Sequence, residues 1–432
     1  MTPSPHSTLP PAARASSTLS CFDLGEQMLS VDEARAALAT LVEQPVGTER
    51  IPLSLAHGRR LADAIHAPIN VPQNTNAAMD GVALAWENAE QTRWTLSGTV
   101  FAGEHWEHPV PAGHCVTITT GAPLPAGTDT VIMREQLAEH GDHVIINAPE
   151  RVKRGQNVRQ AGEDIRKGAM ALSTGTRLDA ARLGLIASLG FADVSVYCRP
   201  RVAVFSTGNE VTAPGEPLPA AGIYDTNRFT LTGLLHEHGA EVVDLGILPD
   251  DADAIREALA HAAETSDLVL TSGGVSVGQA DFTRDALQAL GRLTFWRVAI
   301  RPGRPLACGQ LGERRTPLVG LPGNPVAVMV TFLQFVVPLL QRLEHQPVAP
   351  PRRFTAITDE TLSSRLNRCD FIRGVYQHDV TGQLHVRSTG AQGSGILTSM
   401  VAANCLIELP DERADITPGE TVTIQPLDSV NT

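Results

Sequence analysis

The sequence predicts an α/β fold with β subdomains, and two patterns in its 432 residues carry that prediction. Between residues 201 and 290, short apolar runs alternate with stretches that repeat apolar residues at helical spacing, an order typical of a doubly wound parallel sheet. On both sides of this segment, Gly and Pro divide the chain into short apolar runs, as in domains built from strands. We therefore expect a multi-domain chain with a central doubly wound parallel sheet.

The first predicted element is a helix at about 31–44. Ser30 and Glu33 have the spacing of a capping box, and Ala34 and Leu38 lie on one apolar face. A helix at 178–189 could pack back on this one as a stalk. Between the two helices, the apolar runs predict the strands of a β insert at 94–96, 115–118, 131–133 and 143–146.

The central segment and the C-terminal part follow in chain order. Strands are predicted at 202–205, 241–245 and 267–271, and helices at 226–238, 252–263 and 281–290. An apolar helix at 325–343 follows the Pro and Gly turn LVGLPGNP. The last predicted strands are at 354–357, 371–376, 384–386, 405–409 and 422–424. The expected domains are a disordered tail at 1–24, a discontinuous helical stalk at 25–66 and 160–197, a mixed β insert at 67–159, the α/β domain at 198–346 and a C-terminal β-barrel-like domain at 350–428.

The composition restricts the possible functions. A net charge of −13 argues against broad binding of nucleic acid or of anionic membranes. The six cysteines contain no C-x-x-C pair, so neither a zinc knuckle nor a disulfide framework is predicted. Residues 1–20 lack the features of a signal peptide, and the apolar run 326–340 is shorter than the ~20 residues of a membrane span. We expect a cytoplasmic protein.

The stretch from 267 to 305 predicts an anion site. It consists of an apolar strand, the glycine-rich loop 272–278 and a helix, and the loop after a parallel strand offers free backbone N–H groups to anionic ligands. Asp281 opens the helix, and three arginines follow at 297, 301 and 304. A carboxylate facing guanidinium groups suits a metal ion and an oxyanion in one pocket. The alternative is a glycine turn with a helix-capping Asp and solvated arginines.

Three acids predict a magnesium site. Glu210, Asp250 and Asp281 each follow a predicted parallel strand, so they should lie at one rim of the sheet. Mg²⁺ commonly takes one or two protein carboxylates together with water and phosphate oxygens. Helix capping is the alternative for each acid. The sequence has no H-E-x-x-H, G-x-S-x-G or G-x-x-x-x-G-K motif, so a zinc protease, an elbow serine and a Walker nucleotide site lack support.

Nine short motifs together indicate a family. They are NAAMDG (76–81), TTGAPLPAGTDTVIM (119–133), GEDI (162–165), STGNE (206–210), IYDTNR (223–228), LGILPDD (245–251), SGGVSVGQAD (272–281), RPGRP (301–305) and GLPGNPV (320–326). In order and spacing, the chain from about residue 25 to its end resembles the molybdopterin molybdotransferase family, which comprises the MoeA type of bacteria and the C-terminal domain of gephyrin.

The resemblance implies an activity and an assembly. Members insert molybdenum from molybdate into adenylylated molybdopterin and release AMP with help from a divalent ion such as Mg²⁺, giving molybdenum cofactor. They are elongated homodimers of four subdomains, and the α/β domain of one subunit and the β insert of the other form the active cleft. A molybdopterin adenylyltransferase and molybdoenzymes are possible partners. No nucleic-acid or membrane partner is expected.

The resemblance and the loop analysis also imply site residues. The catalytic candidates are Asp80, Thr120, Asp164, Glu210, Asp250 and Asp281, of which Glu210, Asp250 and Asp281 are the candidate metal ligands. The substrate-binding candidates are Arg159, Ser272, Gly273, Gly274, Ser276, Arg297, Arg301, Arg304, Pro322, Pro325, Arg373 and Ser394. The arginines at 297, 301 and 304 replace the lysines that are usual in the family, and a guanidinium forks its hydrogen bonds where an ammonium does not.

Three other functions fit part of these observations. A scaffold could bind a partner's peptide through the C-terminal β domain, and it would tolerate loss of the acids. A related adenylyltransferase shares the SGG loop, although it would lack both β domains. A tungsten-selective or less active paralogue is compatible with the arginine replacements.

Overall fold

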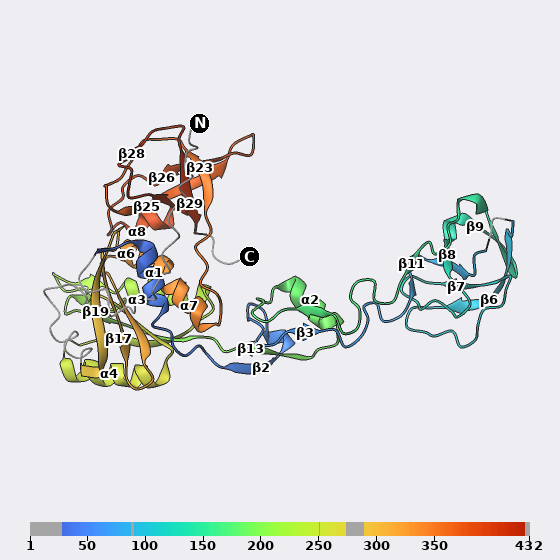
Figure 1. The fold of residues 1–432 in the computed structure, drawn as a ribbon, viewed down its shortest axis with the longest axis horizontal. Helices are drawn as coiled ribbons and strands as arrows, with labels where there is room; N and C mark the ends of the chain where they lie inside the picture. The colour runs from blue at the N-terminus through green and yellow to red at the C-terminus, as the bar shows by residue number, and fades with distance from the viewer. Residues whose placement is uncertain (1–27, 88–89, 250, 274–288, 428–432) are drawn as a thin grey trace, which may run out of the picture. The chain divides into compact units, whose positions relative to one another are not determined.

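The computed structural model describes residues 28–87, 90–249, 251–273 and 289–427. These residues form two compact units (Figure 1). Residues 48–196 are the small unit, and the segments before and after them together form the large unit.

The large unit contains a seven-stranded sheet with the strand order β1-β19-β21-β22-β18-β14-β17. Its strands are β1 (Met28–Leu29), β14 (Arg201–Thr207), β17 (Glu241–Leu248), β18 (Leu268–Ser272), β19 (Gly291–Val298), β21 (Pro305–Leu311) and β22 (Thr316–Leu321). Strands β17, β14, β18 and β22 run parallel, which confirms the predicted parallel sheet. Strand β21 pairs antiparallel with β19 and β22, an extension that the sequence patterns did not predict.

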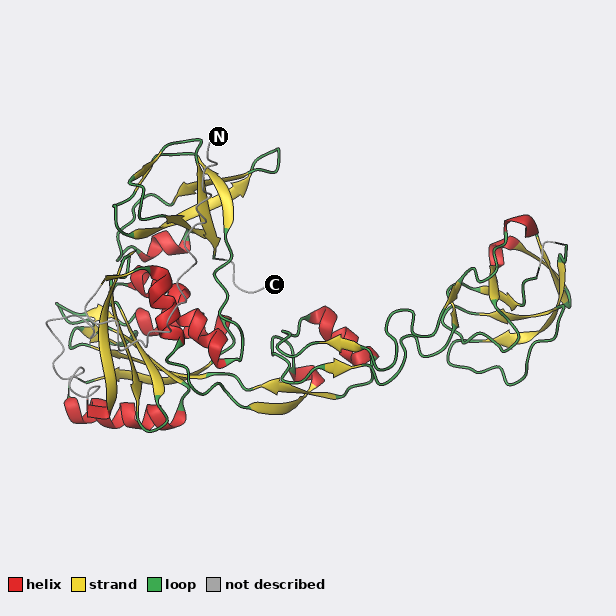
Figure 2. Cartoon of the chain, in the orientation of Figure 1, coloured by secondary structure: helices red, strands yellow, loops and turns green. Residues whose placement is uncertain are grey.

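The two faces of this sheet bury different side chains. Along β14, Val202 and Val204 enter one apolar core, whereas Ala203 and Phe205 enter another, because successive strand side chains point to opposite faces. The α-helices that the described residues of the large unit form are α1 (Val31–Ala39), α3 (Asn227–Glu237), α4 (Ala252–Thr265), α6 (Pro325–Thr331), α7 (Val337–Leu343) and α8 (Leu397–Val401). Side chains of α4 fill the second core, and those of α1, α3, α6 and α7 fill the first. Helices therefore cover both sides of the sheet, as Figure 2 shows.

The predicted helix at 325–343 is present but not uniform. Helix α6 leads into a π-helical segment, η4 (Phe332–Val336), which continues as α7. Within the described residues it is the one helix long and apolar enough to cross a membrane, and 72% of its most apolar stretch is buried. That burial is expected of a core helix in a globular domain.

Helix α1 begins as the sequence predicts but packs elsewhere. Ser30 and Glu33 form the capping box, with the Glu33 backbone N–H donating to the Ser30 hydroxyl at 3.2 Å and the Ser30 N–H donating to the Glu33 carboxylate at 2.8 Å. The apolar face of α1 contributes Ala34 and Leu38 to the first core of the large unit. The expectation that it packs against the helix at 178–189 is wrong. Helical spacing identifies the buried face but not its partner, which here is the apolar surface of η4 and α7.

The C-terminal part of the large unit is a closed barrel. The barrel strands are β23 (Phe354–Thr358), β25 (Cys369–His378), β26 (Leu384–Ser388), β27 (Cys405–Leu409) and β29 (Thr421–Pro426), whereas β24 (Leu362–Ser363) and β28 (Asp415–Ile416) form a separate two-stranded pair. The pairings run β25-β26-β23-β29-β27 and return from β27 to β25, so the ring closes. The short strand β20 (Ile300–Arg301) leaves the α/β part and pairs with β25. The predicted β-barrel-like domain is confirmed.

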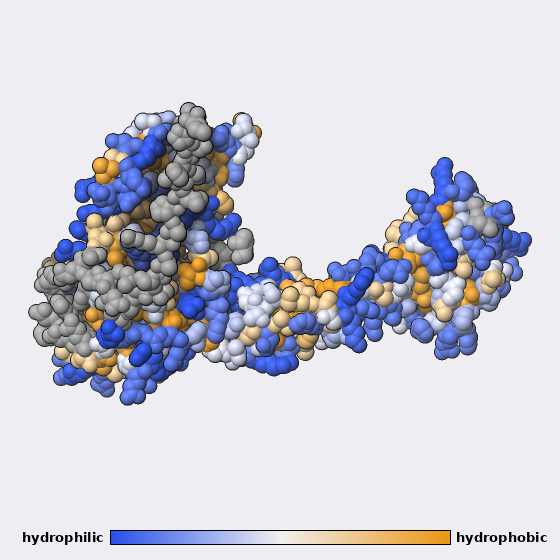
Figure 3. All heavy atoms as spheres, in the orientation of Figure 1, coloured by the Kyte–Doolittle hydropathy of each residue, from blue (hydrophilic) through white to orange (hydrophobic). Residues whose placement is uncertain are grey.

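The small unit contains a six-stranded sheet with the order β8-β5-β7-β6-β10-β9 and several two-stranded pairs. Its elements are β2 (Thr48–Pro52), β3 (Ile65–His66), β4 (Asn76–Ala77), β5 (Gly81–Leu84), β6 (Arg93–Val100), β7 (His114–Ile118), β8 (Thr130–Met133), β9 (Leu137–His140), β10 (His143–Ile146), β11 (Val158–Arg159), β12 (Met170–Leu172), α2 (Ala180–Ser188) and β13 (Asp193–Tyr197). The predicted strands of the β insert fall within β6, β7, β8 and β10, and α2 packs in a separate core with Leu61, Leu178 and Val196. Hydrophilic residues dominate the visible surface of this unit in Figure 3.

Candidate functional site

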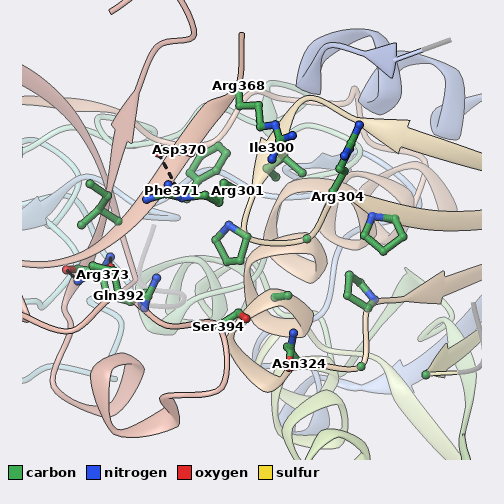
Figure 4. Close-up of a pocket in the computed structure, with 18 residues that line it drawn as sticks. Ile300, Arg301, Arg304, Asn324, Arg368, Asp370, Phe371, Arg373, Gln392 and Ser394 are labelled. Carbon is green, nitrogen blue, oxygen red and sulfur yellow. Dashed lines mark hydrogen bonds and ion pairs between the residues drawn. The ribbon is translucent and has the colours of Figure 1, made fainter. Parts of the chain in front are cut away.

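A cavity of about 500 Å³ lies in the large unit between the turn after β20, the start of α6 and the barrel. Four arginines line it, Arg301, Arg304, Arg368 and Arg373, and we call it the basic pocket (Figure 4). Gly273, Pro322 and Ser394 also line it, so seven residues converge although they come from distant parts of the chain. Of the arginines, Arg368 was not predicted. It stands only five residues before Arg373, and that local concentration of positive charge was the available signal.

The turn RPGRP directs Arg301 and Arg304 toward this cavity. Arg301 is held on β20 by its pairing with Asp370 of β25, and the carbonyl of Arg304 accepts the Val298 N–H at 2.9 Å. Gly303 has a φ of +109°, a conformation that suits glycine. An added Cβ at Gly303 would lie 2.4 Å from Cγ2 of Thr331. The turn therefore requires glycine both for its backbone angle and for the space beside α6.

Arg373 is a fixed wall of the basic pocket. It is 2% exposed, its Nε donates to the Ser399 hydroxyl at 3.0 Å, and one terminal nitrogen donates to the Gly393 carbonyl at 3.1 Å. Burial, followed by the positive charge of Arg301, lowers the pKa of Arg373 from its usual value. An anion in the cavity would relieve both effects, because it would supply the missing negative charge.

One carboxylate lies among these arginines. Asp370 is 1% exposed, and its Oδ2 lies 3.3 Å from Nε of Arg301 and accepts the Ser364 hydroxyl at 3.1 Å. Burial raises the pKa of Asp370 above its usual value, although Arg301 acts in the opposite direction. The sequence analysis did not select Asp370. Its position among the apolar residues Phe371 and Ile372 on a strand was the signal for a buried acid.

A second cavity, of about 420 Å³, adjoins the first, because Gly273 and Gly323 line both. We call it the acidic pocket. It lies at the carboxyl ends of β14 and β18, where Ser206, Thr207 and Ser272 line it. The side-chain amide of Asn227 donates to the Ser272 hydroxyl and to the Gly323 carbonyl, each at 2.7 Å. It therefore connects the end of β18 to the turn before α6. Loops at this end of a parallel sheet commonly bind anionic groups of a ligand.

Two carboxylates of the acidic pocket differ in their environment. Asp225 is buried and already occupied: it accepts the Ser206 hydroxyl at 3.0 Å and lies 2.8 Å from Nε of Arg228. Glu210 is exposed and lines the pocket, and no hydrogen bond or ion pair connects its carboxylate to another described residue. Of the two, Glu210 is therefore the carboxylate available to a cation.

The other predicted metal ligands, Asp250 and Asp281, lie outside the described residues, as do Gly274 and Ser276. Within the described residues, no group of three or more His, Cys, Asp or Glu side chains could hold a metal. One unpaired carboxylate near the carboxyl end of the parallel strand β14 still fits the way Mg²⁺ is usually held, by one or two carboxylates with water and phosphate oxygens.

Arg297 lies apart from both pockets. It is exposed on β19, whereas its neighbours Trp296 and Val298 are buried. Strand side chains alternate between faces, so the buried neighbours turn Arg297 outward. Pro325, in contrast, lines the acidic pocket as the first residue of α6.

The remaining candidates are exposed residues of the small unit. The structure brings Asp80 and Thr120 together: the backbone N–H and the hydroxyl of Thr120 both donate to Oδ1 of Asp80 at 2.7 Å. These bonds hold the pKa of Asp80 below its usual value. Arg159 ends β11, opposite Asn76 of β4, and the Asp164 N–H donates to the Val71 carbonyl at 3.0 Å.

Comparison with known proteins follows the same domain order. A model of the MoeA N-terminal region (domain I and II) matches residues 29–190, a model of a probable molybdopterin binding domain matches 203–342, and a model of the MoeA C-terminal region (domain IV) matches 355–427. A protein of Haemophilus influenzae named molybdopterin molybdenumtransferase is 43% identical over 92% of this chain and 98% of its own length. The chain belongs to the MoeA family.

Further relatives support this membership of the MoeA family. A Nostoc protein with the same name is 34% identical over 87% of this chain and 88% of its own length. The crystal structure of a molybdopterin biosynthesis moeA protein from Pyrococcus horikoshii has a TM-score of 0.79 and 30% identity, and the match covers 93% of this chain and all of that one. The chain is thus a transferase of molybdenum cofactor biosynthesis. A single-domain adenylyltransferase is excluded, because the matched N-terminal and C-terminal regions have no place in it.

Proposed function

We propose that this MoeA family member inserts molybdenum from molybdate into adenylylated molybdopterin and releases AMP in an Mg²⁺-dependent step, giving molybdenum cofactor. The observation that carries the proposal is the junction of the basic and acidic pockets at Gly273 and Gly323. The basic pocket can hold an oxyanion, and the adjoining acidic pocket can hold a phosphate-bearing ligand next to it.

The basic pocket suits molybdate. Four guanidinium groups line it, and Gln392 and Ser394 add neutral polar groups. A tetrahedral dianion can accept several hydrogen bonds from such forked donors at once. The arginines would hold the anion and stabilise negative charge as oxygen ligands of molybdenum are exchanged for sulfur.

The acidic pocket suits the adenylylated ligand. Thr207 and Ser272 place hydroxyl groups at the carboxyl ends of two adjacent parallel strands. Leu218, Ile223 and Tyr224 add apolar surface that a flat ring system can cover. We expect the phosphates near Ser272 and Gly273, with the dithiolene end directed toward the basic pocket.

Glu210 would hold Mg²⁺ together with phosphate oxygens, and we propose Asp250 and Asp281 as its other ligands. When bound, Mg²⁺ would neutralise charge on the pyrophosphate as the P–O bond is cleaved. The chain's own part is to place the carboxylate: Glu210 follows β14 closely, and its carboxylate folds over Gly208, where an added Cβ would lie 2.7 Å from Oε2. No covalent intermediate with the protein is needed.

We also propose a cytoplasmic homodimer in which the small unit of one subunit completes the cleft of the other. Asp80, Thr120, Arg159 and Asp164 would then face the partner's substrate. This arrangement explains why exposed polar residues of the small unit match the family's functional positions. A molybdopterin adenylyltransferase that supplies the substrate and molybdoenzymes that accept the product are the proposed transient partners.

The test is AMP release from adenylylated molybdopterin with Mg²⁺, with and without molybdate. We expect molybdate to stimulate release, chelation of Mg²⁺ to abolish it, and Glu210→Gln to lower it at least tenfold by removing a carboxylate ligand. Glu237→Gln is the matched control, because Glu237 is an exposed acid on α3 outside both pockets. Release that ignores molybdate, with tight binding of molybdopterin, would instead favour a binding or scaffold role.

A further inference from the structure

The pair formed by Arg301 and Asp370 connects the two halves of the basic pocket. Arg301 belongs to β20, which leaves the α/β part, and Asp370 belongs to β25 of the barrel. The two strands run parallel, and the two residues are direct partners in their pairing. Backbone pairing therefore places this carboxylate beside this guanidinium, as the dashed line in Figure 4 shows.

The two partners differ in burial. The Asp370 side chain is 1% exposed, whereas the Arg301 side chain is 38% exposed. The printed contact of the pair joins Oδ2 of Asp370 to Nε of Arg301, at 3.3 Å, and no hydrogen bond connects the two terminal nitrogens of Arg301 to a described residue. The carboxylate is thus the fixed end of the pair, and the free edge of the guanidinium remains for a ligand in the cavity.

A buried carboxylate in a site for anions requires an explanation. Its burial is unfavourable, and its charge repels the ligand that the arginines attract. Burial raises the pKa of Asp370, because the buried environment disfavours the charged form of its carboxyl group. Two roles would compensate for this cost: Asp370 reduces the repulsion between Arg301 and Arg373, or it holds Arg301 in one orientation.

We infer that Asp370 is a positioning residue, which fixes Arg301 through Nε so that its two terminal nitrogens bind the oxyanion. This inference rests on the proposed function, since it specifies how the basic pocket holds molybdate. It also gives a reason for arginine at position 301. A guanidinium has one nitrogen for the carboxylate and two for the anion, whereas the single ammonium of a lysine would have to serve both.

The two roles predict opposite effects of neutralising Asp370. If Asp370 acts only through its charge, Asp370→Asn removes a repulsive charge, and molybdate binds more tightly. If it positions Arg301, the same change loosens the guanidinium, and molybdate binds roughly tenfold more weakly. The Michaelis constant for molybdate should rise correspondingly, while AMP release at saturating molybdate stays nearly unchanged.

The experiment measures molybdate binding to the full chain by calorimetry, for Asp370→Asn in the Arg301 and Arg301→Lys backgrounds. We expect weaker binding in the first background and a much smaller change in the second, because an ammonium has no separate edge to be positioned. Glu408→Gln is the matched control, since Glu408 pairs with Arg353 at 2.7 Å on the barrel and lines neither pocket. It should leave molybdate affinity unchanged.

A second variant keeps the inference testable if Asp370→Asn does not fold. Ser364→Ala removes the hydroxyl that Asp370 accepts at 3.1 Å while the carboxylate keeps its charge. If Asp370 positions Arg301, this variant should also bind molybdate more weakly. If Asp370 acts only through its charge, the molybdate affinity should not change. Tighter binding by Asp370→Asn, or equal effects in the two backgrounds, would overturn the inference while molybdate-stimulated AMP release still stood. Failure of the unchanged chain to release AMP, with the binding pattern intact, would overturn only the proposed function.

Discussion

At the scale of single residues, the arginines of the basic pocket are not equivalent. Arg373 is buried and hydrogen-bonded to Ser399 and Gly393, whereas Arg304 is exposed and lines the cavity from the turn before β21. An arginine with structural partners serves the fold as well as the ligand. An exposed arginine serves the ligand alone.

This difference predicts that substitutions of Arg304 and Arg373 have similar effects on molybdate binding but different effects on stability. Arg304→Gln should raise the Michaelis constant for molybdate roughly tenfold and leave the melting temperature unchanged. Arg373→Gln should do the same and also destabilise the chain by about 1–3 kcal/mol, because it leaves buried acceptors without donors. Steady-state kinetics and thermal melts distinguish the two, with Arg387→Gln on the exposed side of the barrel as control. Equal melting temperatures for both pocket variants would contradict this assignment.

Asp80 gives a prediction of pH dependence. Hydrogen bonds from the backbone and hydroxyl of Thr120 lower the pKa of Asp80 from its usual 3.8. A pKa depressed in the folded state means that the contact contributes stability above the unfolded pKa and loses it as pH falls through the folded value. In NMR spectra, the Thr120 amide should therefore titrate with a midpoint below pH 3.8. Asp80→Asn should abolish that transition, and a midpoint above 3.8 would refute the contact.

Sequence patterns identified many pocket residues but not their arrangement. The structure brings Arg301, Arg304, Arg373 and Ser394 into one cavity, and their roles remain predictions. Arg297 was grouped with them because it shares a short motif region, yet strand alternation turns it outward. Asp370 was missed because an acid on an apolar strand has no local signal that reveals its partner. That partner comes from a different domain.

At the scale of elements, the sequence predicted parallel strands and capped helices better than the connections between them. Apolar runs marked β14 and β18, because these strands are buried on both faces, and they marked β17 at the sheet edge, where the apolar side chains are only partly buried. The antiparallel strand β21 follows a Pro and Gly turn, and the sequence patterns predicted no element there. Helix α1 was predicted with its cap, but its packing partner was predicted wrongly, since spacing defines a buried face and not what covers it.

The turn after β20 is the element whose shape the pocket most requires. Gly303→Ala would combine a φ of +109° with a Cβ 2.4 Å from Thr331, a buried residue whose hydroxyl is bonded to Ala327. We expect a destabilisation of about 2–4 kcal/mol and weaker molybdate binding. Gly382→Ala is the control, because Gly382 has a φ of +85° but no neighbour within 4 Å. Urea unfolding should show a clearly smaller loss of unfolding free energy for the control than for Gly303→Ala. Equal losses would mean that the contact with Thr331 does not destabilise the protein.

At the scale of the whole molecule, the candidate residues are divided between two units. The large unit contains both pockets, and the small unit contains Asp80, Thr120, Arg159 and Asp164. The small unit is one continuous segment with its own apolar cores, so it is well suited to present these residues to another subunit. This division motivates the proposed shared cleft.

Complementation between two impaired chains tests the shared cleft. Co-expression of Asp80→Ala and Arg304→Gln chains should restore about a quarter of the activity, because half of the dimers are mixed and each has one intact cleft. Activity is measured as AMP release at low molybdate, where Arg304→Gln alone is weakest. A chain with both substitutions provides the baseline. No recovery in mixed dimers would place the small-unit residues in the cleft of their own subunit.

The central claim is that the basic pocket holds molybdate for insertion. Its most direct test is anomalous diffraction at the molybdenum absorption edge, from crystals of this chain soaked in molybdate. We predict one dominant peak within hydrogen-bonding distance of Arg301, Arg304 and Arg373, which is lost in Arg304→Gln crystals soaked at the same concentration. A dominant peak elsewhere in the molecule, or an unchanged peak in Arg304→Gln, would contradict the claim.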